Sequence, residues 1–187
     1  RSEAIDDEVA RLLYKTGCRN LNYAPESGSK NTLKRIKKKV NLDSMRKSMR
    51  SCMKAGIIVK SNTIVGFPEE THLDVWKTLW WLSSITIRGV HDATVSMYIP
   101  YPGTEIFDGL MKAGKVKFND EYFNSLATRG NFFANISHSE HISDRALGRY
   151  IMFANVIILI LGAVRRPMKY PKGLFNILFN KSEESRM

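Results

Sequence analysis

Apolar residues recur every three or four positions in several segments of the chain, a spacing that places them on one face of an α-helix. These segments are residues 4–16, Asn41–Gly56, the stretch that opens at Thr71, and Glu105–Lys112. Asn41 is a favourable N-cap residue, and Thr71 with Asp74 supplies the two halves of a capping box. Gly17 and Gly56 follow apolar runs and suit helix C-termini. We therefore predict a helix in each segment.

Runs rich in β-branched residues lie between the predicted helices. We expect strands near residues 20–24, 57–65 and 92–99. Because strands and helices alternate with a period of roughly 35–40 residues, the pattern predicts right-handed β-α-β units and a parallel sheet covered by helices. Three strands cannot close a barrel, so the predicted fold class is α/β, either as part of a barrel or as a small open sheet.

The loops after the three predicted strands are candidates for a ligand site, because parallel α/β folds bind ligands at the carboxyl ends of their strands. These loops are Glu26-Ser27-Gly28-Ser29, Gly66-Phe67-Pro68-Glu69-Glu70-Thr71 and Pro100-Tyr101-Pro102-Gly103-Thr104. In a parallel sheet all three lie on one rim. The carboxylate of Glu26 can accept hydrogen bonds from two sugar hydroxyls, or it can simply lie near a helix N-terminus. The geometry favours a ligand site.

The composition is that of a globular protein, with 43% hydrophobic and 25% charged residues, which excludes the disordered, collagen-like and low-complexity classes. The net charge of +11 is concentrated in one segment, because Lys30–Lys60 holds eleven basic residues and one acid, Asp43. This segment either binds an anionic partner or forms the solvated face of one or two helices.

The chain has two cysteines, Cys18 and Cys52, which argues against a disulfide-built secreted scaffold and favours a cytoplasmic protein. We interpret both as structural thiols. His138 and His141 are three positions apart, but no acidic or thiol ligands at a metal-binding spacing accompany them. Because the first residue is Arg1 and not Met, we interpret the chain as a piece of a longer protein.

The three loops, in this order and spacing, resemble the second half of the radical S-adenosylmethionine (SAM) domain. The resemblance covers residues 5–115 and rests on Glu26-Ser27-Gly28, on Asn62-Thr63-Ile64-Val65-Gly66-Phe67-Pro68-Glu69 and on Met97-Tyr98-Ile99-Pro100-Tyr101-Pro102-Gly103-Thr104. The family pattern of the second element is G-x-I-x-G-x-x-E, and Asn62 replaces its first glycine. These loops are most similar to those of members that carry a cobalamin-binding domain.

The resemblance implies half of a TIM-type radical SAM barrel in residues 1–115 and a C-terminal extension, first loop-rich and then helical, in residues 116–187. It also implies a SAM site. The residues of that site are Glu26 and Ser27 for the ribose, Ile64 and Gly66 for the adenine ring, and the backbone of Tyr98, Ile99 and Pro100 for the adenine edge. The family's Glu at the position of Glu69 braces the loop and does not touch the ligand.

The family binds its [4Fe–4S] cluster through a C-x-x-x-C-x-x-C motif that this chain lacks. The resemblance therefore implies part of an enzyme that cleaves SAM reductively, with the cluster ligands and a cobalamin domain in a missing N-terminal half. The leading interpretation is cobalamin-dependent methylation or ring formation on a small-molecule substrate. The alternatives are a tRNA methylthiotransferase-like enzyme and a non-catalytic SAM-like or anion-binding module. The lack of a recognisable RNA-binding module argues against nucleic acid as a partner.

An uncharged stretch runs from Tyr150 to Val164 and ends at Arg165-Arg166. As a helix it spans about 22 Å, short of the ~30 Å hydrocarbon core of a membrane, so we do not expect it to cross one. It packs on a partner domain or the missing half, or it lies on a membrane surface as a peripheral contact. A second apolar helix is expected around Leu174–Phe179. By resemblance, residues 115–142 help to cover the substrate.

Overall fold

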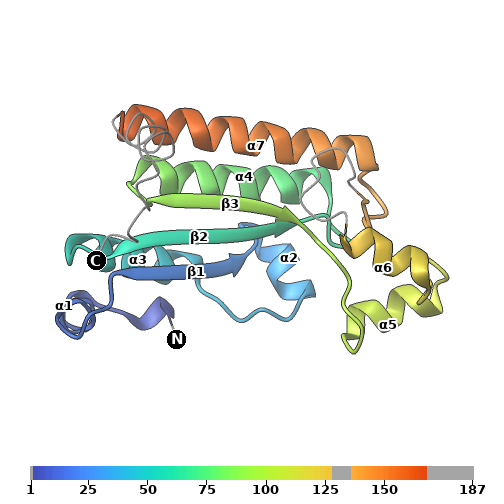
Figure 1. Cartoon of the computed structure of the whole chain (residues 1–187), viewed down its shortest axis with the longest axis horizontal. Helices are drawn as coiled ribbons and strands as arrows, with labels where there is room; N and C mark the ends of the chain where they lie inside the picture. Colours follow the sequence, from blue (N-terminus) through green and yellow to red (C-terminus); the bar gives the residue numbers. More distant parts are fainter. Residues whose placement is uncertain (1, 128–135, 168–187) are drawn as a thin grey trace.

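The computed structural model describes residues 2–127 and 136–167. In chain order the elements are η1 (Ser2–Ala4), α1 (Asp7–Lys15), β1 (Asn20–Glu26), α2 (Lys30–Arg35), α3 (Leu42–Lys54), β2 (Ile58–Val65), α4 (His72–Ile87), β3 (Asp92–Met97), α5 (Glu105–Lys112), α6 (Asp120–Ala127) and α7 (Asp144–Arg165). The alternation of strands and helices over the first hundred residues is the predicted one (Figure 1).

The three strands form one parallel sheet in the order β1-β2-β3. Asn20 pairs with Ile58 at the start of the first ladder, and Lys60 pairs with Asp92 at the start of the second. Both pairings are parallel, so the predicted topology is confirmed. This arrangement is that of a partial TIM-type barrel, in which consecutive strands are neighbours. In the part of the chain that the structure describes, β1 is an edge strand, paired with β2 on one side and with no strand on the other.

Helices cover one face of the sheet. Helices α3 and α4 lie behind the strands in Figure 1, and α7 lies along α4 and β3. Between these helices and the sheet lies the main core, which includes Met49 and Cys52 of α3, Leu82 and Ile85 of α4, and Val59 of β2. Every one of these side chains is at most 1% exposed.

The other face of the sheet is largely polar and exposed. Alternate residues along the strands point to it, since side chains in a strand alternate between faces. The exposed residues are Asn22 and Ala24 of β1, Lys60 and Asn62 of β2, and Thr94 and Ser96 of β3. Asn62 and Thr94 are register partners and hydrogen-bond each other, with 2.9 Å between Thr94 Oγ1 and Asn62 Oδ1. This face corresponds to the interior of a closed barrel.

Side-chain caps begin the helices where the sequence predicted them. The Asn41 carboxamide accepts from the Ser44 amide at the start of α3. Thr71 and Asp74 form a complete capping box at the start of α4. Ser143 caps α7, which begins at Asp144. Because each cap satisfies backbone donors that the helix leaves free, these residues fix where the helices enter the structure.

The C-terminal part departs from the sequence prediction in two ways. Residues 120–127 form helix α6 inside a segment that we expected to be loop-rich. Helix α7 begins six residues before Tyr150 and has 22 residues, about 33 Å long at 1.5 Å per residue. The length argument against a membrane span was therefore wrong. The apolar helix expected around residues 174–179 lies outside the described residues.

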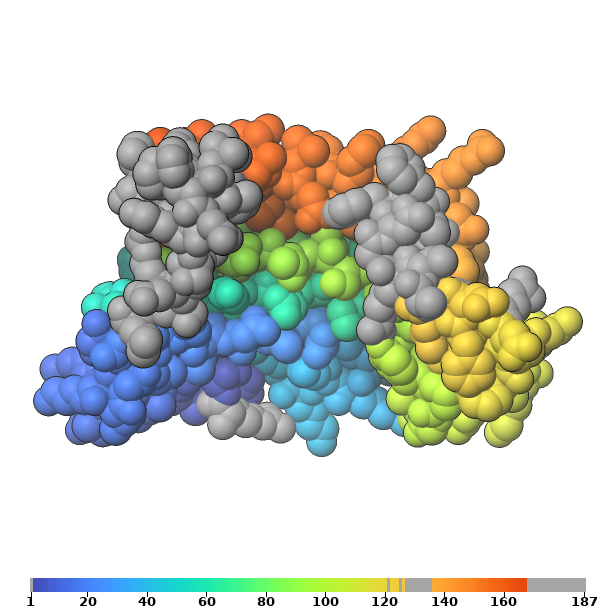
Figure 2. All heavy atoms as spheres, in the orientation of Figure 1, coloured from blue at the N-terminus to red at the C-terminus, as the bar shows by residue number. Residues whose placement is uncertain are grey.

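Helix α7 is long and apolar enough to cross a membrane, judged by length and composition alone, and it is the one such helix in the described part of the chain. Leu147, Ile151 and Ala154 of α7 join the main core of the sheet. Residues on both sides of the predicted boundary between residues 115 and 116 therefore contribute to the main core. Figure 2 shows α7 forming one long side of the molecule, with α5 and α6 protruding at one end.

Candidate functional site

The three loops predicted to hold a ligand leave the sheet at the same rim. Glu26 closes strand β1 opposite Thr63, and Val65 pairs with Met97 at the ends of β2 and β3. The backbone amide of Tyr98 continues this ladder beyond β3 by donating to the Val65 carbonyl at 2.7 Å. The predicted common rim is therefore confirmed, and it borders the polar face of the sheet.

Glu26 has an unusual backbone conformation. Its φ is +70°, in the left-handed region that non-glycine residues seldom adopt. The ladder between β1 and β2 shifts register between Tyr23 and Glu26, so a bulge turns the end of the strand. The carboxylate is partly exposed and accepts a hydrogen bond from Lys38 Nζ at 3.0 Å. Strained backbone of this kind is concentrated at functional sites, and here it sets the direction of one carboxylate.

The alternative interpretation placed Glu26 at a helix N-terminus. In the structure Ser29 is the N-cap of α2, and its side chain accepts from the Thr32 amide. The partner of the Glu26 carboxylate is a lysine from the basic segment and not a helix end.

Ser27 lies in a buried polar network below the rim. Its hydroxyl is 2.9 Å from Thr78 Oγ1 of α4 and accepts from the Ser29 amide. The Ser29 hydroxyl in turn donates to Asp74 Oδ1 at 2.6 Å. Burial acts to raise the pKa of Asp74, but hydrogen bonds from Ser29 and Thr71 together with the Arg35 charge hold it below its usual range. The Ser27 side chain therefore has protein partners, and its role toward a ribose stays a prediction.

Gly28 allows the loop after β1 to touch helix α4. A Cβ at this position would lie 2.6 Å from Trp81 Cβ and 2.7 Å from the Lys77 carbonyl oxygen. The Gly28 amide also donates to Thr78 Oγ1 at 3.1 Å. The loop that carries Glu26 is thus fixed to α4 by contacts that tolerate no side chain.

The loop after β2 is braced by Glu70. This side chain is 1% exposed, and its carboxylate accepts from the Gly66 amide at 2.6 Å and from the Thr32 hydroxyl at 3.3 Å. Burial raises the pKa of Glu70 to about 7, although these hydrogen bonds act to lower it. Glu69, which we expected to brace the loop, is an exposed side chain beside Arg35. That expectation was wrong by one position.

Gly66 lies between the sheet and helix α7. Its φ is +90°, and a Cβ there would lie 2.9 Å from Leu147 Cδ2. The left-handed backbone favours a glycine here, whether or not an adenine ring also approaches. Ile64 lies two positions before Gly66, on the polar face of the sheet. It is half-buried against a second apolar cluster. Their roles toward adenine stay predictions.

The segment Tyr98–Pro100 borders that second cluster. Tyr98 stacks on Phe67 with ring centroids 4.7 Å apart, and burial raises the pKa of its phenol. The Pro100 carbonyl accepts from the Tyr122 hydroxyl of α6 at 2.7 Å, so α6 lies against the end of β3. Ile99 is half-buried between them. The backbone contact of this segment with adenine is untested.

The segment that follows α6 returns along the rim. The Glu140 amide donates to the Pro68 carbonyl, and the Ser139 hydroxyl donates to the Glu70 carbonyl at 2.7 Å. The ring of His138 lies 6.1 Å from that of Tyr98. Chain beyond β3 therefore borders the loops after β3 and β2, where a substrate cover was expected.

The sequence motifs in the loops did not identify the polar face of the sheet as part of the site. Lys60 and Asp92 are register partners, and the hydrogen-bonded pair Asn62–Thr94 follows toward the rim. Parallel sheets are ordinarily apolar on both faces, so polar side chains at every second position are a signal of a lined cavity. Lys60 and Asn62, two positions apart in the predicted strand, carried that signal in the sequence.

The described residues offer no place for an iron–sulfur cluster. No group of three or more His, Cys, Asp or Glu side chains that could hold a metal occurs in residues 2–127 and 136–167. Cys52 is buried with its sulfur 3.3 Å from the Tyr23 hydroxyl, and burial raises the pKa of its thiol. Cys18 is half-buried. The interpretation of Cys52 as a structural thiol is confirmed.

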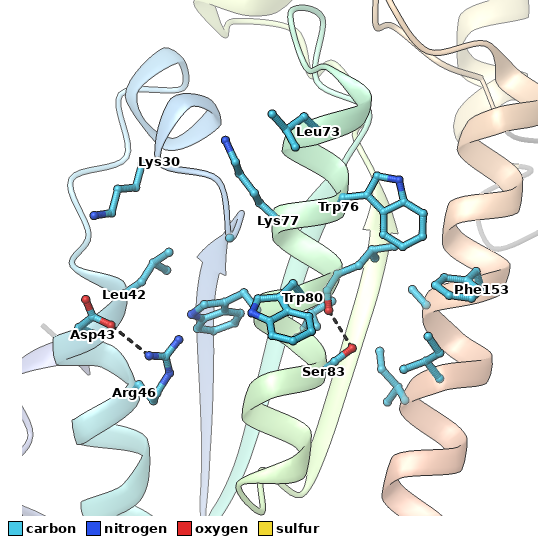
Figure 3. A pocket seen from close by; sticks show the side chains of 17 residues that line it. Lys30, Leu42, Asp43, Arg46, Leu73, Trp76, Lys77, Trp80, Ser83 and Phe153 are labelled. Carbon is cyan, nitrogen blue, oxygen red and sulfur yellow. Dashed lines mark hydrogen bonds and ion pairs between the residues drawn. The ribbon is translucent and has the colours of Figure 1, made fainter.

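A groove of about 730 Å³ lies on the opposite, helical side of the molecule. Helices α3, α4 and α7 contribute its walls, and Trp76, Trp80 and Phe153 are prominent among its side chains (Figure 3). It shares Gly28 with the loop after β1 but none of the predicted SAM residues. The groove is therefore separate from the rim.

Comparison with known proteins finds similarity in the first part of the chain. Residues 1–82 match the model of the Radical SAM superfamily. A methyltransferase of Pyrococcus horikoshii, described as uncharacterized, is 26% identical over 108 residues, which are 58% of this chain and 23% of that protein. The threonylcarbamoyladenosine tRNA methylthiotransferase MtaB of Thermotoga maritima is 31% identical over 107 residues, 54% of this chain and 24% of that protein.

The chain thus spans less than a quarter of the length of these curated relatives. The matched region holds β1, β2 and their loops, together with most of α4. The parallel sheet and the common rim agree with this match, and residues 1–82 are similar to part of the domain of the radical SAM superfamily, a family of enzymes.

Proposed function

We propose that the whole protein binds SAM across the rim formed by the ends of β1, β2 and β3. The observation that carries this proposal is Glu26, a partly exposed carboxylate at the end of β1, where a bulge and a left-handed backbone turn the strand. A carboxylate can accept hydrogen bonds from both hydroxyls of a ribose. Lys38 Nζ donates a hydrogen bond to the same carboxylate at 3.0 Å.

The adenine is proposed to lie between the loop after β2 and the segment after β3. Ile64 supplies an apolar contact, and the backbone of Gly66 and of Tyr98–Pro100 supplies hydrogen-bonding groups at the rim. Glu70 holds the Gly66 loop through its carboxylate, and Phe67 stacks on Tyr98, so both segments are fixed before a ligand arrives. A pre-formed site binds without the cost of ordering loops.

The reaction requires groups beyond this chain. In the radical SAM family a [4Fe–4S] cluster supplies the electron that cleaves SAM, and the cysteines for it are proposed to lie in another part of the protein. Within this chain the polar face of the sheet is proposed to receive the substrate, with Lys60 and Asp92 as charged groups and Asn62 and Thr94 as hydrogen-bonding groups.

The proposed reaction is transfer of a methyl group to a small-molecule substrate, with cobalamin supplied by another part of the protein. The similarity to a methyltransferase of Pyrococcus horikoshii supports methyl transfer. Methylthiolation is the second candidate, because MtaB of Thermotoga maritima is a tRNA methylthiotransferase. Cobalamin content of the purified intact protein separates the two, because our methyl-transfer proposal requires cobalamin and the methylthiolation alternative does not.

The SAM site is tested with the Glu26→Gln variant of the intact protein. This change removes the charge but keeps the shape and the left-handed backbone of the position. Loss of a charged hydrogen bond of about 1.5–3 kcal/mol predicts a Kd for SAM that is roughly 10–150 times higher in anaerobic equilibrium dialysis. Iron content should not change, because no cysteine is altered.

Glu105→Gln is the matched control. Glu105 is also a carboxylate paired with a lysine of the basic segment, Lys37, but it lies on exposed helix α5. The Kd of the Glu105→Gln variant for SAM should equal that of the parent. If Glu26→Gln also binds SAM as tightly as the parent, the carboxylate only pairs with Lys38 and the ribose assignment is wrong.

A further inference from the structure

Helices α4 and α7 present a wide apolar surface to solvent on the side away from the open sheet face. Trp80 is 78% exposed and Val164 is 78% exposed. The other exposed apolar side chains of this surface are Leu73, Trp76 and Ile87 of α4 and Met152, Phe153, Val156, Leu159 and Ile160 of α7. A contiguous apolar surface of this kind on a soluble domain marks an interaction site.

The two helices run side by side in the same direction. The Tyr150 hydroxyl near the start of α7 is 2.9 Å from His72 Nδ1 at the start of α4. At the other end, the Arg166 guanidinium donates to the Gly89 carbonyl just after α4. Between these points Trp76 and Phe153 pack edge to face with ring centroids 5.5 Å apart. The apolar surface is therefore one pair of packed helices about 33 Å long, taking α7 at 1.5 Å per residue.

A basic hollow adjoins this surface at the C-terminal ends of α4 and α7. Its volume is about 340 Å³, and its walls come from α3, α4, α7 and the start of the loop before β3. Its charged lining residues are Arg46, Lys47, Arg50, Arg88 and Arg165. No Asp or Glu lines it among the described residues. Three of the five cations, Arg46, Lys47 and Arg50, belong to the basic segment Lys30–Lys60 but take no part in the rim site.

We propose that this side of the molecule, the α4–α7 surface with the basic hollow, docks on the surface of an anionic lipid membrane. Tryptophan, flanking arginines and long aliphatic side chains are the groups that settle at the boundary between lipid headgroups and acyl chains. The hollow offers several cations to lipid phosphates, and juxtaposed basic residues are attracted to the negative surface of anionic lipids. The apolar α4–α7 surface and the basic hollow thus both contact the same membrane surface.

The aliphatic character of α7 favours lipid over nucleic acid. Bases stack on aromatic and guanidinium planes. The exposed residues of α7 are instead Met152, Val156, Leu159, Ile160 and Val164 beside a single phenylalanine. These side chains have no stacking surface, but they partition readily into acyl chains.

Helix α7 lies along the membrane plane in this arrangement and does not cross it. Leu147, Ile151 and Ala154 are buried against the sheet, and Arg166 is bonded to the loop after α4. Crossing would strip these contacts from the core. The open sheet face and the rim with Glu26 then stay on the side away from the lipid, so docking leaves the SAM site accessible.

The test is vesicle co-sedimentation of the intact protein. Vesicles of phosphatidylcholine with roughly 30 mol % phosphatidylserine should bind the parent, and pure phosphatidylcholine vesicles should bind it markedly less. Trp80→Glu and Val164→Glu should each weaken binding by roughly tenfold or more, because a charge replaces an inserted apolar group. Leu12→Glu on α1 is the matched control, since Leu12 is also an exposed apolar residue but does not belong to the α4–α7 surface. It should bind like the parent.

The basic hollow is tested with a charge-matched pair of variants. Lys47→Gln with Arg50→Gln should weaken binding to the anionic vesicles by roughly 30-fold and reduce its salt dependence. The control combines Lys112→Gln at the end of α5 with Lys117→Gln in the segment after it. It removes the same charge far from the basic hollow and should weaken vesicle binding less.

Three outcomes would overturn the proposal. The first is that the intact protein does not sediment with anionic vesicles. The second is salt-dependent retention of tRNA without vesicle binding. The third is that alkaline carbonate fails to release the protein from vesicles, which would show a helix that crosses the bilayer.

Discussion

Glu70 is a buried acid whose ionisation destabilises the described fold. Its carboxyl is buried and holds the loop after β2, with a pKa raised to about 7 by burial. Because the unfolded chain releases this proton near pH 4.5, the folded state binds more protons between pH 4.5 and 7, and stability falls as the pH rises through that range. The loss is on the order of 3 kcal/mol.

We therefore expect Glu70→Gln to flatten the pH dependence of unfolding. The amide keeps an acceptor for the Gly66 amide and supplies a donor for Thr32, but it has no proton to release. The urea midpoint of the variant should fall less than that of the parent between pH 5 and 8. Glu69→Gln, at an exposed neighbour, should follow the parent. An equal fall in Glu70→Gln and the parent would mean that Glu70 ionises without cost.

The sequence could not tell these two glutamates apart. They are adjacent in a loop, and which one turns inward depends on the left-handed backbone of Gly66 and on Thr32 from a distant helix. The same holds for Ser27, whose partner Thr78 lies 51 positions away. Glu26 was identified from the loop motif, but its positive φ and its pairing with Lys38 follow from tertiary structure alone.

At the scale of elements, the packing of the β1–α2 loop on α4 depends on a missing side chain. We expect Gly28→Ala to destabilise the protein by roughly 3 kcal/mol or more, because the new methyl group would meet the backbone of Lys77 and Thr78 at 2.7 and 2.8 Å. Backbone atoms cannot move aside as the tip of a side chain can. Thermal unfolding of the variant measures the effect.

Gly109→Ala is the control for this change. Gly109 lies inside helix α5, and a Cβ there would meet no atom within 4 Å. It should stabilise the helix by roughly 0.5–1 kcal/mol, the difference between glycine and alanine in a helix. A Gly28→Ala variant that is as stable as the parent would mean that the loop moves freely over α4.

Elements with a clear period were predicted well, and short or irregular ones were not. The three strands and helices α3, α4 and α5 follow from apolar spacing and caps. Helix α2 has six residues and depends on its Ser29 cap and the burial of Leu33, which no local pattern reveals. Helix α6 packs through Tyr122 on Pro100. The length of α7 was underestimated because its first turn carries charged residues, which an apolar stretch excludes.

At the scale of the molecule, the sheet ends at β1 without a further strand in the described part of the chain. An exposed strand edge pairs with other chains, and the apolar surface of α4 and α7 adds to this tendency. We expect this chain, expressed by itself, to form concentration-dependent oligomers in size-exclusion chromatography. After anaerobic reconstitution it should contain no stoichiometric [4Fe–4S] cluster, because no suitable ligand group is present in the described residues. A monomer with a stable cluster would contradict both expectations.

The polar face of the sheet affects the heat-capacity change that accompanies binding. Barrels of this class are commonly filled by layers of bulky aliphatic side chains. Asn62, Thr94 and Ser96 instead present exposed polar side chains where such a layer would pack. A molecule that enters displaces water from polar groups and not from an apolar wall. Its binding is therefore accompanied by only a small change in heat capacity, which distinguishes entry along this face from burial in an oily pocket.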